Sequence, residues 1–191
     1  MKMSVILARE KKLIFTIIIN LFITIFEVIG GLLSNSLALV SDAIHNLNDT
    51  FSLFLSYIAL KISRKPYSKS WTFGFKRAEI IVAFFNTVFL VIIVIFIIYN
   101  ALKRLFLNDN INSGLMLWVA IIGFIGNFVS VFLLHRDSRE NLNIRSAYLH
   151  LLGDTLSSIA VILGALMIIF LKKSWIDPII SLLISIIILK E

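Results

Sequence analysis

The sequence of 191 residues contains no cysteine. Disulfide bonds, thiolate ligands to a metal and thiol catalysis are therefore excluded for these residues. A metal site built from this chain has to use nitrogen and oxygen donors, which come from histidine imidazoles and from carboxylates.

Charged residues are also scarce, at 15% of the chain, while 59% of the residues are hydrophobic. The mean hydropathy of +0.98 is too high for a soluble domain with a polar surface. The apolar residues form continuous stretches of about 20 residues instead of alternating with polar ones, which favours helices over the strands of a membrane barrel. We therefore predict an all-α polytopic membrane protein with six transmembrane helices, at residues 13–33, 36–60, 79–102, 114–134, 146–171 and 176–189.

Proline is rare as well, since only Pro66 and Pro178 occur, and no low-complexity segment divides the chain. Pro178 falls near the start of the last predicted helix, where proline is tolerated. We therefore expect residues 1–191 to form a single transmembrane domain, with no room after the sixth apolar stretch for a soluble domain.

The net charge of +7 comes from basic residues that lie mainly in the connections between apolar stretches. They gather before the first predicted helix, in the second connection and in the fourth, whereas the first connection at residues 34–36 carries no charge. Because basic connections stay on the cytoplasmic side of a membrane, both termini are predicted to face the cytoplasm. Orientation in the lipid bilayer thus explains the positive charge, and no nucleic-acid partner is expected.

A short pattern of polar residues occurs twice inside the apolar stretches. His45 to Ser52 reads HNLNDTFS and His150 to Ser157 reads HLLGDTLS, so that both follow H-x-L-x-D-T-x-S. A histidine and an aspartate four residues apart project from the same face of a helix on successive turns, so that one ion can contact both. The two segments lie on the second and the fifth predicted helices.

These two helices run in opposite directions in the predicted topology. Placed side by side, they bring His45 level with Asp154 and Asp49 level with His150, near the middle of the membrane. Ionised carboxylates at that depth are costly unless they are paired, so a cation is expected there. The sequence therefore predicts a buried site of two histidines and two aspartates, a donor set that suits the tetrahedral coordination of zinc.

The helix faces that carry these residues are small and polar. On the fifth predicted helix this face includes Ser146, Gly153, Ser157 and Ser158. Small residues permit close contact between helices, and hydroxyl groups hold water. We interpret the two faces as the lining of a path for a partly hydrated ion.

Several further polar residues lie inside apolar stretches and are interpreted beside the four candidate ligands. Asp42 is interpreted as a residue at a helix start, or as one that orients His45, and not as a fifth ligand. Glu27 is interpreted equally well as a proton relay and as an internal pairing group. Asn86 and Asn127 are interpreted as hydrogen-bonding links between helices.

Three other functions remain beside metal transport. A bis-histidine haem protein for electron transfer would use His45 and His150 as axial ligands, but it leaves the two aspartates unexplained. A membrane metallohydrolase would need an open coordination position and a general base, and no H-E-x-x-H motif occurs. A metal-binding membrane protein that does not transport its ion is the third.

The sequence resembles the cation diffusion facilitators, a family typified by zinc transporters. The similarity rests on long stretches in the family's order, which are FEVIGGLLSNSLALVSDAIHNLND at residues 26–49, WTFGFKRAEIIVAFFN at 71–86, LNIRSAYLHLLGDTLSSIAVILGAL at 142–166 and WIDPIISLLI at 175–184. The family's transport site then falls on His45, Asp49, His150 and Asp154. The resemblance also implies six helices with cytoplasmic termini, a homodimer and a location in the bacterial cell (inner) membrane.

The resemblance further implies a transporter and not an enzyme, with no organic cofactor. Its implied function is efflux of a divalent transition metal in exchange for protons by alternating access. Zinc is the favoured substrate because zinc-preferring members have the same two histidines and two aspartates, and Cd²⁺, Co²⁺, Fe²⁺ and Mn²⁺ stay open. Members with aspartate at the position of His45 accept cadmium more readily.

The sequence departs from the family's pattern in two respects. Family members usually continue into a cytoplasmic metal-binding domain, which is absent here, so the homodimer is expected to be weaker. The connections also lack histidine-rich runs, and accessory metal sites are therefore not expected there.

Overall fold

The computed structural model describes residues 2–63, 77–107, 110–135, 138 and 142–190. These residues form six α-helices, and no strand occurs among them. The helices are α1 (Lys2–Ser34), α2 (Leu37–Ser63), α3 (Arg77–Arg104), α4 (Ser113–His135), α5 (Leu142–Leu171) and α6 (Ile176–Lys190). The prediction of an all-α protein with six helices is therefore confirmed.

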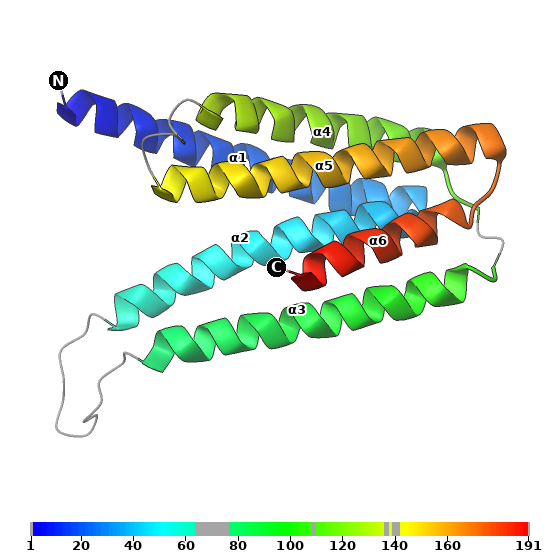
Figure 1. The fold of residues 1–191 in the computed structure, drawn as a ribbon, viewed down its shortest axis with the longest axis horizontal. Helices are drawn as coiled ribbons and strands as arrows, with labels where there is room; N and C mark the ends of the chain where they lie inside the picture. The colour runs from blue at the N-terminus through cyan, green and yellow to red at the C-terminus, as the bar shows by residue number, and fades with distance from the viewer. Residues whose placement is uncertain (1, 64–76, 108–109, 136–137, 139–141, 191) are drawn as a thin grey trace.

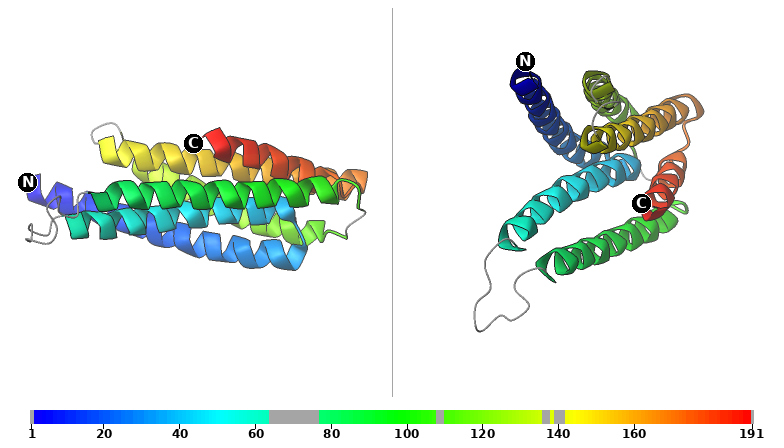
Figure 2. Two further views of the ribbon diagram at one scale, coloured as in Figure 1. Left: turned by 90° about the horizontal axis from the view of Figure 1, so that it is seen from below. Right: turned by 60° about the vertical axis from the view of Figure 1, so that its left-hand side comes forward.

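The helices form two groups of three that run roughly along one axis (Figures 1 and 2). In the first group α4 packs against both α1 and α5, and in the second α2, α3 and α6 pack against one another. Contacts of α2 with α1 and α5, and of α6 with α5, join the two groups. Figure 1 shows that α2 and α5 run in opposite directions, as predicted.

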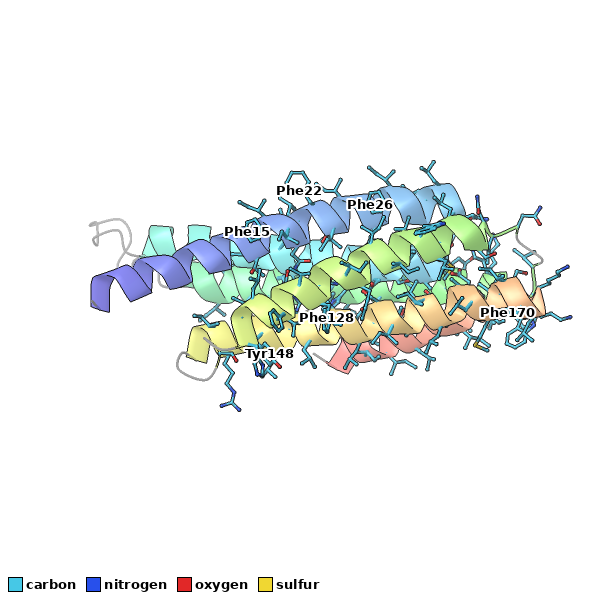
Figure 3. All side chains as sticks on the ribbon, turned by 90° about the horizontal axis from the view of Figure 1, so that it is seen from above. Phe15, Phe22, Phe26, Phe128, Tyr148 and Phe170 are labelled. Carbon is cyan, nitrogen blue, oxygen red and sulfur yellow. The ribbon has the colours of Figure 1, made fainter. Side chains whose placement is uncertain are left out.

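The outside of the bundle is apolar and its inside holds many of the polar residues. Four helices contain segments that are long and apolar enough to cross a membrane, at Phe15–Ser34, Ile80–Arg104, Ser113–His135 and Ile144–Leu171, and α6 is a shorter apolar helix. Large side chains such as Phe22, which is 70% exposed, cover the outer surface, and Figure 3 shows Phe22 and Phe26 on the outward side of α1. Such a surface is stable only against hydrocarbon.

The end of α2 that follows α1 is fixed by side chains. Asn35 turns the chain between the helices with a positive φ of 56°, and the Ser36 hydroxyl accepts a hydrogen bond of 3.2 Å from Leu39 N, as an N-cap does. Asp177 of α6 accepts from Ser36 Oγ at 2.5 Å, from Leu37 N at 2.7 Å and from Ala38 N at 3.3 Å. Three donors at the start of α2 are thus satisfied by one carboxylate from α6.

The predicted boundaries agree with the structure to within a few residues, except at the start of α1. That helix begins at Lys2 and not near residue 13, because residues 2–12 contain neither glycine nor proline to end it. Most of the basic second connection, at residues 64–76, lies outside the described residues.

Candidate metal site between α2 and α5

The four predicted ligands come together between the two helix groups. His45 and Asp49 lie on successive turns of α2, and His150 and Asp154 lie on successive turns of α5. Because the two helices are antiparallel, Asp49 comes level with His150, and Asp49 Oδ2 lies 3.5 Å from His150 Nε2. This is the pairing across the helices that the sequence predicts.

Two further contacts join Asp49 and His150 to the other two candidate ligands. His45 Nε2 lies 3.5 Å from Asp49 Oδ2, and His150 Nε2 lies 3.6 Å from Asp154 Oδ2. The two imidazole rings approach edge to face, with centroids 6.2 Å apart. Asp49 Oδ2 is therefore shared between the two histidines, one from each helix.

These distances can be compared with those in a zinc site. Zinc bonds of about 2.0–2.2 Å to nitrogen and oxygen place neighbouring donors of a tetrahedron about 3.3–3.6 Å apart. The three contacts between donors therefore have the spacing of adjacent ligands. Among the described residues, however, no group of three or more His, Asp or Glu side chains converges on one ion position as it stands. Binding of an ion would require small rotations of these side chains.

The four side chains differ in their access to the surface. His45 is 9% exposed and Asp154 is 2% exposed, whereas Asp49 is 26% exposed and His150 is 31% exposed. Asp49 is the later ligand on α2 and His150 the earlier one on α5, so both lie closer to the end of the bundle where α2 ends and α5 begins. The site is thus more open toward that end than toward the Ser36 end.

Asp42 connects the same two helices one turn from His45. The hydroxyl of Ser157 on α5 donates a hydrogen bond to Asp42 Oδ1, and the carboxylate is buried. Since α2 begins at Leu37, Asp42 does not lie in the first turn of the helix, and that interpretation is wrong. The contact with Ser157 makes Asp42 a link that holds α2 against α5 beside the four donors.

Glu27 contacts α2 through Asn46, the residue that follows His45. Asn46 Nδ2 donates a hydrogen bond of 3.4 Å to Glu27 Oε2, and Glu27 is 1% exposed. A Cβ placed on Gly123 of α4 would collide with Glu27 Oε1, so the missing side chain there makes room for the carboxylate. The partner seen for Glu27 is an amide and not a cation.

The family model for the cation efflux transmembrane domain matches residues 13–191. The chain belongs to this family of cation efflux transporters. Its apolar helices and bacterial relatives identify it as an integral protein of the bacterial inner membrane. The predicted membership of the cation diffusion facilitators is confirmed.

Several curated relatives are similar over most of the chain. A cadmium, cobalt and zinc/H⁺-K⁺ antiporter of Bacillus velezensis is 42% identical over 186 residues, which are 96% of this chain and 59% of that protein. The zinc transporter ZitB of Escherichia coli is 39% identical over 184 residues, again 96% of this chain and 59% of the relative. The metal cation efflux system protein CzcD of Cupriavidus metallidurans is 41% identical over 161 residues, or 84% and 51%. The chain thus spans less than two thirds of the length of these relatives.

The structure of this cation efflux domain also corrects part of the sequence interpretation. Ser146 and Gly153, which the sequence places on the ligand face of α5, are exposed, whereas Ser158 is buried. Asn127 is buried, but neither polar atom of its side chain has a hydrogen-bond partner among the described residues, so it does not link helices there. Asp177 was not identified from the sequence, although an aspartate in the first turn of a helix is a common capping signal.

Proposed function

We propose that this chain is the membrane domain of an efflux transporter for divalent transition-metal cations, with zinc as the favoured substrate, exchanged for protons. The observation that carries the proposal is the set of contacts of 3.5–3.6 Å among two imidazoles and two carboxylates from antiparallel helices inside a membrane domain. The names of the relatives agree with it, since they include a zinc transporter and a cadmium, cobalt and zinc antiporter.

The donor set favours zinc over harder cations. Two imidazole nitrogens and two carboxylate oxygens suit a tetrahedral ion of intermediate softness, and the sequence offers no thiolate. Cobalt and cadmium are named for the relative from Bacillus velezensis. We therefore expect selectivity in the order zinc, then cobalt and cadmium, with iron and manganese bound more weakly.

Exchange for protons follows from the chemistry of the ligands. A histidine binds a metal only in its neutral form, so protonation of His45 or His150 competes with the ion. The higher exposure of Asp49 and His150 agrees with an arrangement open toward the end where α2 ends, which the basic residues assign to the cytoplasm. Metal would enter from this side, and protonation after reorientation of α2 and α5 would release it outside.

The geometry supports the haem protein and the non-transporting metal-binding protein less well than a carrier. Asp49 Oδ2 lies 3.5 Å from Nε2 of both histidines, so a carboxylate occupies the place that a haem iron would need. A protein that binds the metal without transporting it would give no metal flux across the membrane, whereas a carrier would. The homodimer and the assignment of residues 1–191 to a single domain stay predictions.

Transport in proteoliposomes tests the proposal. We expect the purified chain to move zinc into vesicles along an imposed pH gradient, and we expect His45→Ala and Asp154→Ala to abolish this flux while the helical content stays unchanged. Ser146→Ala is the matched control, because Ser146 lies one turn from His150 on α5 and is exposed. Normal flux in either ligand variant would remove the assignment of the site. Saturable zinc binding without flux in the unsubstituted chain would favour the non-transporting alternative.

A further inference from the structure

A column of buried and half-buried polar side chains lies between α1, α2 and α4, apart from the four candidate ligands. Thr16 and Asn20 belong to α1, Asn46 to α2, and Asn127 and Ser130 to α4. Each has at least one buried polar side-chain atom with no hydrogen-bond partner among the described residues. These atoms are Thr16 Oγ1, Asn20 Oδ1, Asn46 Oδ1, Asn127 Nδ2, Asn127 Oδ1 and Ser130 Oγ.

The packing of α1 against α4 sets the order of these residues along the column. Close approaches pair Gly30 with Val119, Glu27 with Gly123, and Ile23 with Gly126, so that the two helices are antiparallel in a regular register. The same register brings Asn20 of α1 level with the turn of α4 that carries Asn127 and Ser130. Thr16 lies one turn further from Glu27, toward the N-terminal end of α1.

The column has a polar end and an apolar end. From Glu27 toward the end of the bundle where α1 begins, the inward face of α4 carries Asn127 and Ser130. On the other side of Glu27 that face carries Met116, Val119 and Ala120, which are part of the buried apolar core. Along α4, the buried polar residues therefore begin at the level of Glu27 and continue only toward the side that the basic residues assign to the cytoplasm.

Unpaired polar atoms inside a membrane protein call for water. A buried polar group without a partner costs about 1–3 kcal/mol, and six such atoms would cost too much for a marginally stable fold. Ordered water satisfies such groups where several of them face a common space. Carbonyl, amide and hydroxyl groups at successive turns, with a carboxylate at the end, are suitable for a chain of water molecules.

We propose that α1, α2 and α4 enclose a hydrated path to Glu27, and that Glu27 is a second proton-binding site, separate from the four candidate ligands, which releases its proton along this path to the cytoplasmic side. The proposal rests on the proposed transport function. It assigns the release of a proton into the cytoplasm to a residue other than the histidines that hold the metal.

The charges around Glu27 couple this proton to the metal. Asp42 of α2 and Asp154 of α5 interact electrostatically with Glu27. The only titratable side chain of α4 is His135, which lies at the far end of that helix. Among the described side chains of α1, at residues 15–34, the only titratable one is Glu27 itself. A divalent cation bound at Asp154 favours the ionised form of Glu27, so arrival of the metal from the cytoplasm expels the proton along the path. Release of the metal on the other side of the membrane then favours protonation of Glu27 again.

Labelling of introduced cysteines tests the hydrated path without any assay of transport. Because the natural chain has no cysteine, one substitution provides the only thiol. We expect Ser130→Cys and Asn127→Cys in vesicles to react with a small water-soluble methanethiosulfonate at least about tenfold faster than Val119→Cys or Phe128→Cys, because the reaction needs a hydrated thiolate. Val119 is the buried apolar control and Phe128 the lipid-facing control. Equal rates in all four variants would overturn the path.

Glu27→Gln tests the proton site itself. We expect zinc binding by calorimetry to persist with an affinity about tenfold weaker, because the ionised carboxylate and the metal favour each other, while zinc uptake driven by a pH gradient falls well beyond this loss of affinity. Unchanged uptake, or loss of zinc binding together with uptake, would overturn a separate proton site at Glu27. If the unsubstituted chain moves no metal, the proposed function fails, whereas the labelling of Ser130→Cys still decides whether the path exists.

Discussion

Two carboxylates, Asp177 at the start of α2 and Asp49 near its middle, differ in how their oxygens are used. Asp177 is fully buried and accepts three hydrogen bonds of 2.5–3.3 Å at the start of the helix. Asp49 Oδ2 accepts no hydrogen bond among the described residues and instead lies 3.5 Å from two imidazole nitrogens. A carboxylate saturated with donors fixes structure, whereas one that faces only potential ligands keeps its lone pairs for a cation.

Further contacts hold the start of α2. Its start is held by Asp177 and by Ser181 of α6, whose hydroxyl lies 2.6 Å from that of Ser41. Arg104 of α3 donates bonds of 2.9 and 2.8 Å to Asn35 just before the helix. The candidate ligands come about 12–18 Å further along the axis at 1.5 Å per residue. A tilt of α2 about its start would therefore move His45 and Asp49 while the hydrogen bonds to Asp177 stay formed.

The largest expected effect is on zinc affinity in Asp49→Asn. A four-ligand zinc site provides about 10–16 kcal/mol, so the loss of one donor's share, about 3 kcal/mol, corresponds to about a 100-fold weaker affinity. The free energy of unfolding should change little, because Asp49 Oδ2 accepts no hydrogen bond among the described residues. Calorimetric zinc titration and thermal unfolding in detergent measure the two quantities. An unchanged affinity would show that Asp49 is not a ligand.

Asp177→Ala should give the reverse result. Removal of the carboxylate leaves Ser36 Oγ, Leu37 N and Ala38 N without their acceptor, which we expect to lower the free energy of unfolding by about 2 kcal/mol. Zinc affinity measured below the unfolding transition should stay within about threefold. If Asp177→Ala weakened zinc binding as strongly as Asp49→Asn, the division between a structural and a ligand carboxylate would be wrong.

His45→Asp refines the comparison by exchanging one donor for another at the same place. A carboxylate can bind through both oxygens and so raise the coordination number, which suits the larger cadmium ion better than tetrahedral zinc. We expect the ratio of zinc to cadmium uptake to fall about tenfold, since one ligand exchange is worth about 1.4 kcal/mol of discrimination. Competition between the two ions in the proteoliposome assay measures this ratio. An unchanged ratio would argue against a ligand role for His45.

Much of this organisation can be predicted from the sequence because membrane helices are continuous apolar stretches and because the motif H-x-L-x-D-T-x-S occurs twice. The facing of Asp49 and His150 follows from helix period and topology alone. The hydrogen bonds of Asp177 to the start of α2 could not be predicted, because the backbone amides that donate them, at Leu37 and Ala38, lie far away in the sequence. The exposure of Gly153 was also missed, since a small residue is equally suited to a helix contact and to an exposed surface.

The smallest expected effect comes from two glycines, of which Gly123 faces Glu27 and Gly153 faces open space. Gly123→Ala places a Cβ against the end of the Glu27 side chain, which has to move, and we expect a loss of about 1 kcal/mol in the free energy of unfolding. Gly153→Ala is the matched control, because an added Cβ meets nothing within 4 Å, and alanine stabilises a helix by up to about 1 kcal/mol relative to glycine. Thermal unfolding of both variants should therefore shift in opposite directions. Equal shifts would mean that α4 can withdraw from Glu27 without cost, so that Gly123 would not be needed to seat this carboxylate against α2.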